Sequence, residues 1–488
     1  MTSMLLYGFS SIFISLLYLF NIVCMFFSLN SPMFSYPGFS FLGALSILLF
    51  SIIIILITFK IDLFFFFLPF VILAFPNVIN DFLPSFLLGP PSEYRVASFS
   101  YITHIDLYLI YGIYLNKNRS LRSPNYQNFK FLILFTLLLA IYFILTVLSS
   151  KSIESLSLFA TGNYQLRYAI LFFLLIGHLH LNDCKMRLII YGLSLSIIFL
   201  FFESAVFTIS TGRSTLGSGT LAANVYANIT AALTMFFIFL KRDSFRLPKL
   251  FYRYIRVVTI AIGFLILVLN GTRIAMFSFF LISIVYYLRT SLKTRSFLKF
   301  FGKMVSYFLF FSFLLLIAMQ FERFRGALTI LIDILNSNIK LNESTASLFA
   351  RMHLFKVSIN MINENWLLGI GPGRWNFFKY DYDYQNIGTL LVDTLMDPHN
   401  DYLSYLSQYG LFIGSFMIFF VLIRPSLQFL KKPEDSFLYF GLIPLTLLIS
   451  GLTNSNTLKH QIFATMMLVV LIMYQEVIKK NEPIYSNN

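Results

Sequence analysis

The chain has 488 residues, of which 58% are hydrophobic and 12% are charged, and its mean hydropathy is +0.78. This apolar content exceeds what one water-soluble core can bury, so it excludes an ordinary soluble enzyme and predicts an all-α polytopic membrane protein. The formal net charge of +15 fits either nucleic-acid binding or membrane topology, and the positions of the charges decide between them.

The N-terminal part of the chain has no basic segment before its first apolar run, because the first Lys or Arg is Lys60. A cleavable signal peptide begins with a basic region, so we expect the first apolar segment to remain in the protein. Cys24 and Cys184 form neither a disulfide framework nor a metal pair, and we expect both to be inert.

Apolar runs follow one another along most of the chain. A helix needs about 17–23 such residues to cross a hydrocarbon layer of ~30 Å at ~1.5 Å per residue. The runs predict about 12–14 transmembrane helices, centred near residues 17, 49, 71, 107, 139, 174, 198, 231, 264, 281, 312, 412, 444 and 469. We divide the chain into N-terminal helices without a motif (1–130), a central bundle (131–321), one large outer-face loop with an amphipathic helix (322–401), and C-terminal helices with a tail (402–488).

Basic residues test this arrangement, because Lys and Arg accumulate in cytoplasmic loops. With fourteen spans, alternate loops lie on one side, and most of the 36 Lys and Arg residues fall in those loops. We therefore predict cytoplasmic termini and interpret the basic runs as topology anchors. A nucleic-acid patch is the weaker interpretation, and no nucleic-acid partner is expected. The predicted inner residues are Lys60, Lys117, Arg119, Arg122, Lys130, Lys185, Arg187, Lys241, Arg242, Arg246, Lys249, Arg253, Arg256, Arg289, Lys293, Arg295, Lys299, Lys303, Arg424, Lys431, Lys432, Lys479 and Lys480.

The other basic residues fall on the predicted outer face, where the topology rule does not require them. Arg213 lies in a loop of small residues, with Asn224 and Asn228 just inside the next span, and Arg273 follows Gly271-Thr272 at a tight turn. A charge near the bilayer centre costs about 2.5–3.5 kcal/mol, so each Arg must face water, a partner or an anionic ligand. The alternative for both is an interface Arg that binds lipid headgroups. The full outer set is Arg95, Lys151, Arg167, Arg213, Arg273, Arg323, Arg325, Lys340, Arg351, Lys356, Arg374, Lys379 and Lys459.

The large loop contains an apolar stripe at helical spacing, which predicts an amphipathic helix that lies on the membrane or on the bundle. Arg351 falls off the stripe and is a second phosphate candidate, with a solvated surface Arg as the alternative. His353 is expected on the surface of this helix. The stripe consists of Leu348, Met352, Phe355, Ile359, Ile362 and Trp366.

Three glycines follow this helix, at Gly369, Gly371 and Gly373. They do not follow a strand, so we interpret them as a tight turn that lets backbone approach something closely, and not as a dinucleotide fingerprint. Asp397-Pro398-His399-Asn400 then brings a histidine to the start of the next span. His460 is expected to flank a span.

No metal-ligand set is visible, because His399 has no His or Cys partner at ligand spacing and Asp393, Asp397 and Asp401 alone make a poor cage. The sequence also lacks the Gly-x-Ser-x-Gly elbow of acyl transfer. Several guanidinium groups and one imidazole remain on the outer face. That set suits a diphosphate leaving group and a hydroxyl nucleophile.

The order of these signals resembles the O-antigen ligase and polymerase superfamily of bacterial polysaccharide assembly. The resemblance covers about residues 200–475, and its most specific part is the segment that begins at His399. The matching residues are Arg213 and the Asn-bearing span after it, Gly271-Thr272-Arg273, Arg351, the glycines 369, 371 and 373, His399-Asn400, Tyr402-Leu403 and the segment from Gly410 to Gly414.

The resemblance implies a membrane glycosyltransferase that takes a glycan from an undecaprenyl-diphosphate carrier on the periplasmic face of the bacterial inner membrane. Arg273, Arg351 and Arg213 would bind the donor diphosphate, and His399 would contact the acceptor hydroxyl or act as a base. It also implies that the enzyme needs no metal or cofactor, and that a chain-length-regulating co-polymerase and the lipid bilayer are partners. The supporting residues would be Gly369, Gly371, Gly373, Arg374, Asp397, Asn400 and Tyr402.

Polymerisation of lipid-linked repeat units is our leading interpretation, and ligation to lipid A core is the alternative, because both reactions use the same donor. A transporter or flippase would also expose outer-face arginines, but it should show internal repeats and charges at mid-span, which we do not find. A purely structural membrane protein would not need the long polar loop.

Overall fold

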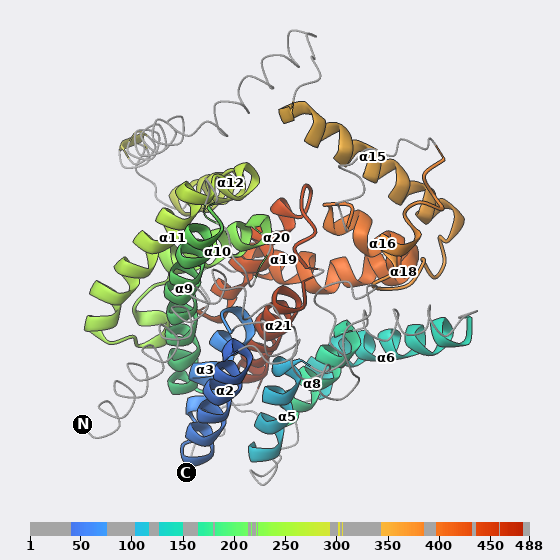
Figure 1. Cartoon of the computed structure of the whole chain (residues 1–488). Coiled ribbons are helices and arrows are strands. Elements are labelled where there is room, and N and C mark those ends of the chain that lie inside the picture. Colours follow the sequence, from blue (N-terminus) through green and yellow to red (C-terminus); the bar gives the residue numbers. More distant parts are fainter. Residues whose placement is uncertain are drawn as a thin grey trace.

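The computed structural model describes residues 41–75, 103–116, 126–149, 164–178, 181–212, 216, 221, 223–292, 301–302, 305, 343–384, 397–431, 436–457 and 459–481. The ordered elements in these ranges are helices, which confirms the all-α fold class (Figure 1). They are α2 (Phe41–Phe59), α3 (Leu63–Leu73), α5 (His104–Asn116), α6 (Tyr126–Ser149), α8 (Tyr164–His178), α9 (Asp183–Thr211), α10 (Ala223–Phe239), η2 (Asp243–Phe245), η3 (Phe251–Ile255), α11 (Arg256–Asn270), α12 (Arg273–Leu292), α15 (Glu343–Glu364), α16 (Trp375–Phe378), α18 (Asp401–Ile418), η4 (Phe419–Ile423), α19 (Arg424–Lys431), η5 (Ser436–Gly441), α20 (Leu442–Ser450) and α21 (His460–Asn481).

The predicted spans correspond to helices wherever the structure describes the chain. The centres near residues 17 and 312 lie outside the described residues, and each of the other centres falls on a helix. Asp183–Ile209, Phe251–Asn270 and Asp401–Lys431 are long and apolar enough to cross a membrane, and shorter apolar helices accompany them. The chain is therefore a multi-pass membrane protein, and the number of its spans stays a prediction.

Helix α3 lies in the core of the bundle. All 11 of its residues are buried, as expected for a helix that is apolar on every side and surrounded by other helices. Helices α9 and α21 pack against it. Gly192 of α9 permits the close approach, because a Cβ there would lie 2.1 Å from the carbonyl oxygen of Phe66. Helix α3 is thus integral to the core.

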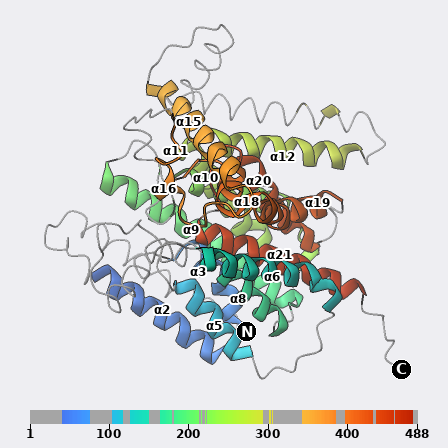
Figure 2. The ribbon, with the colours of Figure 1, turned by 90° about the vertical axis from the view of Figure 1, so that its right-hand side faces the viewer.

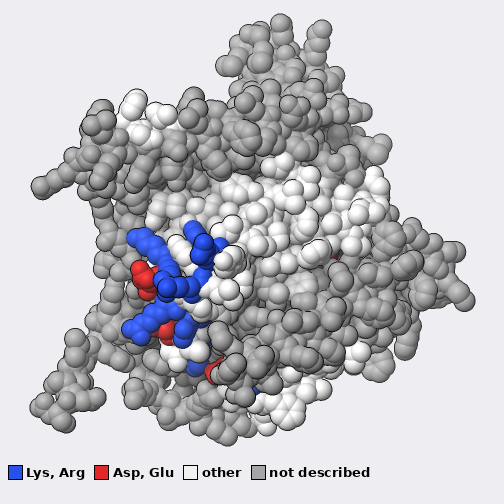
Figure 3. Space-filling model, turned by 90° about the vertical axis from the view of Figure 1, so that its left-hand side faces the viewer, with Lys and Arg blue, Asp and Glu red and all other residues white. Residues whose placement is uncertain are grey.

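Three of the predicted inner loops meet at one end of the bundle. The Arg246 Nε atom lies 3.9 Å from an Asp183 carboxylate oxygen, and Arg187 Nη1 donates to the Arg246 carbonyl at 3.5 Å. Lys185 Nζ lies 4.9 Å from the centre of the Phe65 ring. Figure 3 shows basic side chains gathered on this part of the surface. These contacts bring three of the predicted inner segments to the same end of the bundle, and the alternation of all the loops stays a prediction. The exposed basic residues around α10 and α11 are Lys241, Arg242, Arg246, Lys249 and Arg253.

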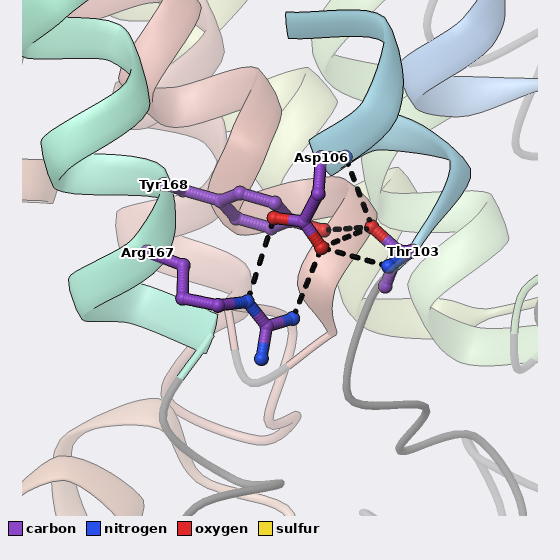
Figure 4. Close-up of polar contacts among 4 residues, drawn as sticks. All are labelled: Thr103, Asp106, Arg167 and Tyr168. Atoms are coloured by element: carbon purple, nitrogen blue, oxygen red, sulfur yellow. Dashed lines mark hydrogen bonds and ion pairs between the residues drawn. The ribbon is translucent and has the colours of Figure 1, made fainter. Parts of the chain in front are cut away.

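Helices α5 and α8 are joined at their N-terminal ends by a polar cluster (Figure 4). Thr103 and Asp106 form a capping box, in which Asp106 N donates to Thr103 Oγ1 at 3.2 Å and Thr103 N donates to Asp106 Oδ2 at 2.7 Å. Arg167 Nη2 pairs with the same carboxylate at 3.2 Å, and the Tyr168 hydroxyl lies 3.0 Å from Thr103 Oγ1. One of the predicted outer cations, Arg167, is thus paired within the protein and joins two helices.

Candidate functional site

Helix α15 is the amphipathic helix predicted in the large loop, and it packs against α18 (Figure 2). The face that it buries differs from the predicted stripe. Leu354, Val357 and Met361 are buried against Ile370 and Trp375, and together these five residues form a small core separate from the main one.

Members of the predicted stripe instead face outward. Met352 and Trp366 are each 50% exposed, and Ile359 is 46% exposed. The prediction was wrong because the partner of the helix is Trp375, which the chain brings back over α15 immediately after the glycine turn. Spacing along one helix cannot reveal such a partner.

The prediction that His353 lies on the helix surface was also wrong. The His353 side chain is 9% exposed, and its Nε2 atom lies 3.0 Å from an Asp383 carboxylate oxygen. Asn360 Nδ2 donates to the Tyr382 carbonyl at 3.0 Å, and Asn365 Nδ2 lies 2.7 Å from the Tyr382 hydroxyl. These contacts attach the segment after α16 to α15 and fix the orientation of the helix.

The glycine turn after α15 packs against a break in α18. Gly369, Gly371 and Gly373 all have positive φ values, of 66°, 97° and 77°, which residues with a Cβ rarely adopt. Gly410 interrupts α18 with φ 73° and ψ 173°. A Cβ on Gly369 would lie 2.5 Å from the Gln408 carbonyl oxygen, and one on Gly410 would lie 2.2 Å from the Leu367 carbonyl oxygen. The turn therefore approaches the backbone of α18, as the sequence indicated in general terms.

Hydrogen bonds across this contact replace those that the break removes from α18. Ile370 N donates to the Ser407 carbonyl, and Gly371 N donates to the Gln408 carbonyl, both at 2.9 Å. In the other direction, Leu411 N donates to the Trp366 carbonyl at 2.8 Å. Non-helical backbone in a membrane protein is tolerated where such internal partners exist. The turn and the break thus stabilise each other.

His399 lies just before α18 and has a backbone φ of 51°, in the left-handed region where His is among the tolerated residues. Its N–H donates to Asp397 Oδ1 at 2.8 Å, which closes an Asx turn. The imidazole Nδ1 atom lies 3.8 Å from the same oxygen. The short Asp397-Pro398-His399 segment thus fixes the imidazole beside a carboxylate.

Charges from three segments act on His399. Burial lowers the pKa of His399 below its ordinary value of 6.5; the Asp397 carboxylate opposes this shift, and the positive charges of Arg351 and Lys459 add to it. Burial likewise lowers the pKa of Arg351, and Asp397 opposes that shift. Arg351 of α15 and Lys459, which precedes α21, therefore lie close enough to His399 for their charges to act on its imidazole.

Asn400 and Asp401 fix the start of α18. Asn400 is the N-cap residue, and its side chain accepts a hydrogen bond from Leu403 N at 2.9 Å. Asp401 is fully buried, and its Oδ1 atom accepts bonds from Thr457 N at 2.8 Å and Thr457 Oγ1 at 2.7 Å. The segment between α20 and α21 is thereby tied to the residues that follow His399. Sequence reasoning missed this role of Asp401.

Arg273 begins α12 and is exposed. The preceding turn is ordered by Asn270, whose Nδ2 atom donates to the carbonyls of Leu216 at 2.7 Å and Ala223 at 3.1 Å. Gly271 ends α11 with a positive φ of 69°. The turn that carries Arg273 is thus attached to the segment before α10. Arg213 lies outside the described residues.

Two other predicted residues make local contacts. Arg374 is buried, and its Nη1 atom donates to the Ile370 carbonyl at 3.3 Å, within the glycine turn. Tyr402 donates its hydroxyl to the Leu448 carbonyl at 2.5 Å and so joins α18 to α20. Through these contacts Arg374 stabilises the glycine turn and Tyr402 stabilises the position of α18. Within the described residues, no group of three or more His, Cys, Asp or Glu side chains is arranged to hold a metal ion.

Comparison with protein families finds a match for the segment that contains most of these residues. Residues 258–419 match the family described as O-antigen ligase. The chain carries an O-antigen ligase domain. The matched O-antigen ligase segment runs from α11 to the start of η4 and contains Arg273, Arg351 and His399, whereas Arg213 and Lys459 lie outside it. No curated protein matches the chain significantly.

The O-antigen ligase domain is shared by polymerases and ligases of surface polysaccharide. The family comprises membrane glycosyltransferases of the O-antigen ligase and polymerase type, which transfer polyprenyl-linked glycans. The resemblance based on short motifs is confirmed at the level of the family. The roles of individual residues stay predictions.

Proposed function

We propose that the protein polymerises undecaprenyl-diphosphate-linked oligosaccharide repeat units into O-antigen or a related surface polysaccharide. Arg351, Asp397 and His399 together carry this proposal. Arg351 and His399 come from separate segments, and the fold brings an imidazole, a carboxylate and a guanidinium into one partly buried group. Such a group can both accept a proton and stabilise an anion.

In the proposed reaction, a hydroxyl oxygen of the acceptor sugar attacks the anomeric carbon of the donor glycan. The bond from that carbon to the carrier diphosphate breaks, the hydroxyl proton passes to His399, and one displacement inverts the anomeric carbon. The burial that lowers the pKa of His399 keeps its imidazole neutral near pH 7, as a base must be. No metal or cofactor takes part in this proposal.

The arginines act on the leaving group. The diphosphate departs as an anion, and charge-assisted hydrogen bonds of about 1.5–3 kcal/mol each would stabilise it most as the glycosidic bond breaks. The planar guanidinium matches phosphate oxygens better than an ammonium does. We assign this role to Arg351 and Arg273, with Arg213 as a third contributor.

We place this chemistry on the periplasmic face and both termini in the cytoplasm. The basic loops that meet at one end of the bundle support this orientation, because positively charged loops remain on the cytoplasmic side. The candidate site lies at helix ends that alternate with those loops. A lipid-linked donor is the natural substrate there, since nucleotide sugars are cytoplasmic.

Glycan profiling of a deletion strain tests the function. If the protein is a polymerase, the deletion removes long chains and leaves single repeat units on lipid A core. Accumulation of carrier-linked polymer would instead identify a ligase, which is the second candidate because it uses the same donor. Unchanged surface glycan, with normal export of every polysaccharide, would contradict both assignments.

A further inference from the structure

Lys459 lies in the connection between α20 and α21, far along the chain from His399. The N-terminal end of α18 holds this connection in place at several points. Asp401 N donates to the Gly451 carbonyl at 2.8 Å, and Asn400 Nδ2 donates to the Leu452 carbonyl at 2.8 Å. Together with the two bonds from Thr457 to Asp401, these contacts fix the connection beside the residues that follow His399.

The backbone of Lys459 is itself ordered. Its N–H donates to the Asn456 carbonyl at 3.1 Å, and its carbonyl accepts from Phe463 N at 3.0 Å in the first turn of α21. Asn456 in turn accepts a bond from Asn228 Nδ2 of α10 at 2.7 Å. The direction in which the Lys459 side chain leaves the backbone is therefore set by the tertiary structure.

The bonds from Thr457 to Asp401 place the segment that carries Lys459 beside the one that carries His399. The positive charges of Lys459 and of Arg351, which comes from α15, both act on the His399 imidazole. Each side chain is partly buried. Among the described residues, neither cationic group makes a hydrogen bond or an ion pair, and Asp397 is the carboxylate that acts on both Arg351 and His399. Partly buried cations without hydrogen-bonded partners are unfavourable unless an anion reaches them.

We propose that Lys459 is a further substrate-binding residue, which contacts a phosphate group of the lipid-linked substrate beside His399. This inference rests on the proposed function and adds a residue outside the matched O-antigen ligase segment. A polymerase joins two carrier-linked glycans and therefore binds two diphosphates. A second cation beside His399 could bind one of them. The Lys459 ammonium is suited to this contact because it is a compact point charge that can bind a phosphate oxygen.

Binding of undecaprenyl diphosphate to the purified full-length protein in phospholipid-free detergent tests the assignment, with undecaprenol as the neutral probe. We expect Lys459→Gln to weaken diphosphate binding about tenfold to a hundredfold, because a charge-assisted contact is lost. Lys459→Arg, which keeps the charge, should bind within about threefold of wild type. Lys356→Gln is the matched control, since Lys356 is exposed on α15, and its binding should not change.

The outcomes separate the inference from the proposed function. Normal binding by Lys459→Gln, together with weak binding by Arg351→Gln, would overturn the role of Lys459 and leave the function intact. Equal binding of undecaprenyl diphosphate and undecaprenol by the wild type would overturn the function itself. If phosphatidylglycerol competes with the diphosphate in the wild type but not in Lys459→Gln, then Lys459 binds lipid headgroups and the assignment to substrate fails.

The dependence of activity on pH is a second measurement, which substitution of a merely structural lysine would not change. The charged groups that act on His399 are Asp397 beside it, Arg351 from α15 and Lys459 before α21. Removing the Lys459 charge raises the pKa of His399, so the acid limb of the activity profile should move to higher pH in Lys459→Gln and return in Lys459→Arg. An unmoved acid limb in Lys459→Gln would contradict the proximity on which the inference depends.

Discussion

The charge state of His399 depends on residues from three separate parts of the chain. In the proposed mechanism His399 is the base, which must be neutral to accept a proton. We therefore expect activity above the pKa of His399 in the folded protein and its loss as the pH falls through that pKa. Burial and the two cations lower that pKa, and Asp397 opposes them. The acid limb of wild-type activity is therefore expected below pH 6.5, the ordinary value for His.

Asp397→Asn tests this balance. The substitution removes the negative charge that favours imidazolium, while the Asn oxygen can still accept the bond from His399 N. We expect the acid limb to move to still lower pH, opposite in sign to the shift for Lys459→Gln. His399→Ala should reduce activity about 10²–10⁴-fold at every pH. Glycan transfer by the purified variants across pH 5–8 measures both effects. Full activity of His399→Ala would contradict the role of His399 as the base.

At the level of secondary-structure elements, the break in α18 and the turn after α15 form one structural unit. Gly410 occupies a backbone region that is essentially restricted to glycine, where other residues cost about 1–3 kcal/mol. The Tyr142 hydroxyl of α6 donates to the Gln408 carbonyl at 2.7 Å and to the Leu368 carbonyl at 3.0 Å. A third helix therefore stabilises the same junction, which connects the loop to the membrane bundle.

Gly410→Ala should destabilise this junction. The new Cβ would lie 2.2 Å from the Leu367 carbonyl oxygen, so we expect a loss of at least about 2 kcal/mol, from the backbone strain and the steric clash together. Thermal unfolding in detergent measures the loss. Gly212→Ala, at φ 64° and with no atom of the described residues within 4 Å of the new Cβ, tests the effect of φ alone and should cost less. Equal unfolding temperatures for Gly410→Ala and wild type would contradict the tight contact.

At the scale of the whole molecule, contacts bring the basic segments around Lys185 and Arg246 to one end of the bundle, and the proposed topology places this end in the cytoplasm. Cys184 is a free, exposed thiol in the first turn of α9, beside one of the basic segments, and Lys356 is exposed on α15. The proposed topology places these two residues on opposite sides of the membrane.

Thiol labelling of intact cells with a membrane-impermeant maleimide tests the orientation. Cys184 should react only after the cells are permeabilised, because the N-terminal end of α9 is placed in the cytoplasm. In a variant with both native cysteines replaced by Ser, Lys356→Cys should react without permeabilisation, since α15 is placed outside. The cysteine-free variant is the control. Reaction of Cys184 in intact cells would reverse the proposed topology.

Patterns that depend on neighbouring residues could be predicted from the sequence. Apolar runs predicted the helices, because burial in hydrocarbon requires length and composition that are visible locally. The tight turn at Gly369, Gly371 and Gly373 was anticipated, since closely spaced glycines indicate turns, and the positive φ values of all three fit it. The short motifs were also enough to suggest the family, because Arg273, Arg351 and His399 all lie within the matched segment.

Which residues meet was decided by the tertiary structure alone. The buried face of α15 depends on Trp375, the glycine turn depends on the break at Gly410, and the charge on His399 depends on Lys459. In each case the partner is distant along the chain or lies across a change of chain direction that periodicity does not encode. By itself the sequence determined a helical membrane protein with polar groups on one predicted face; packing of separate helices decided which of those groups share a site.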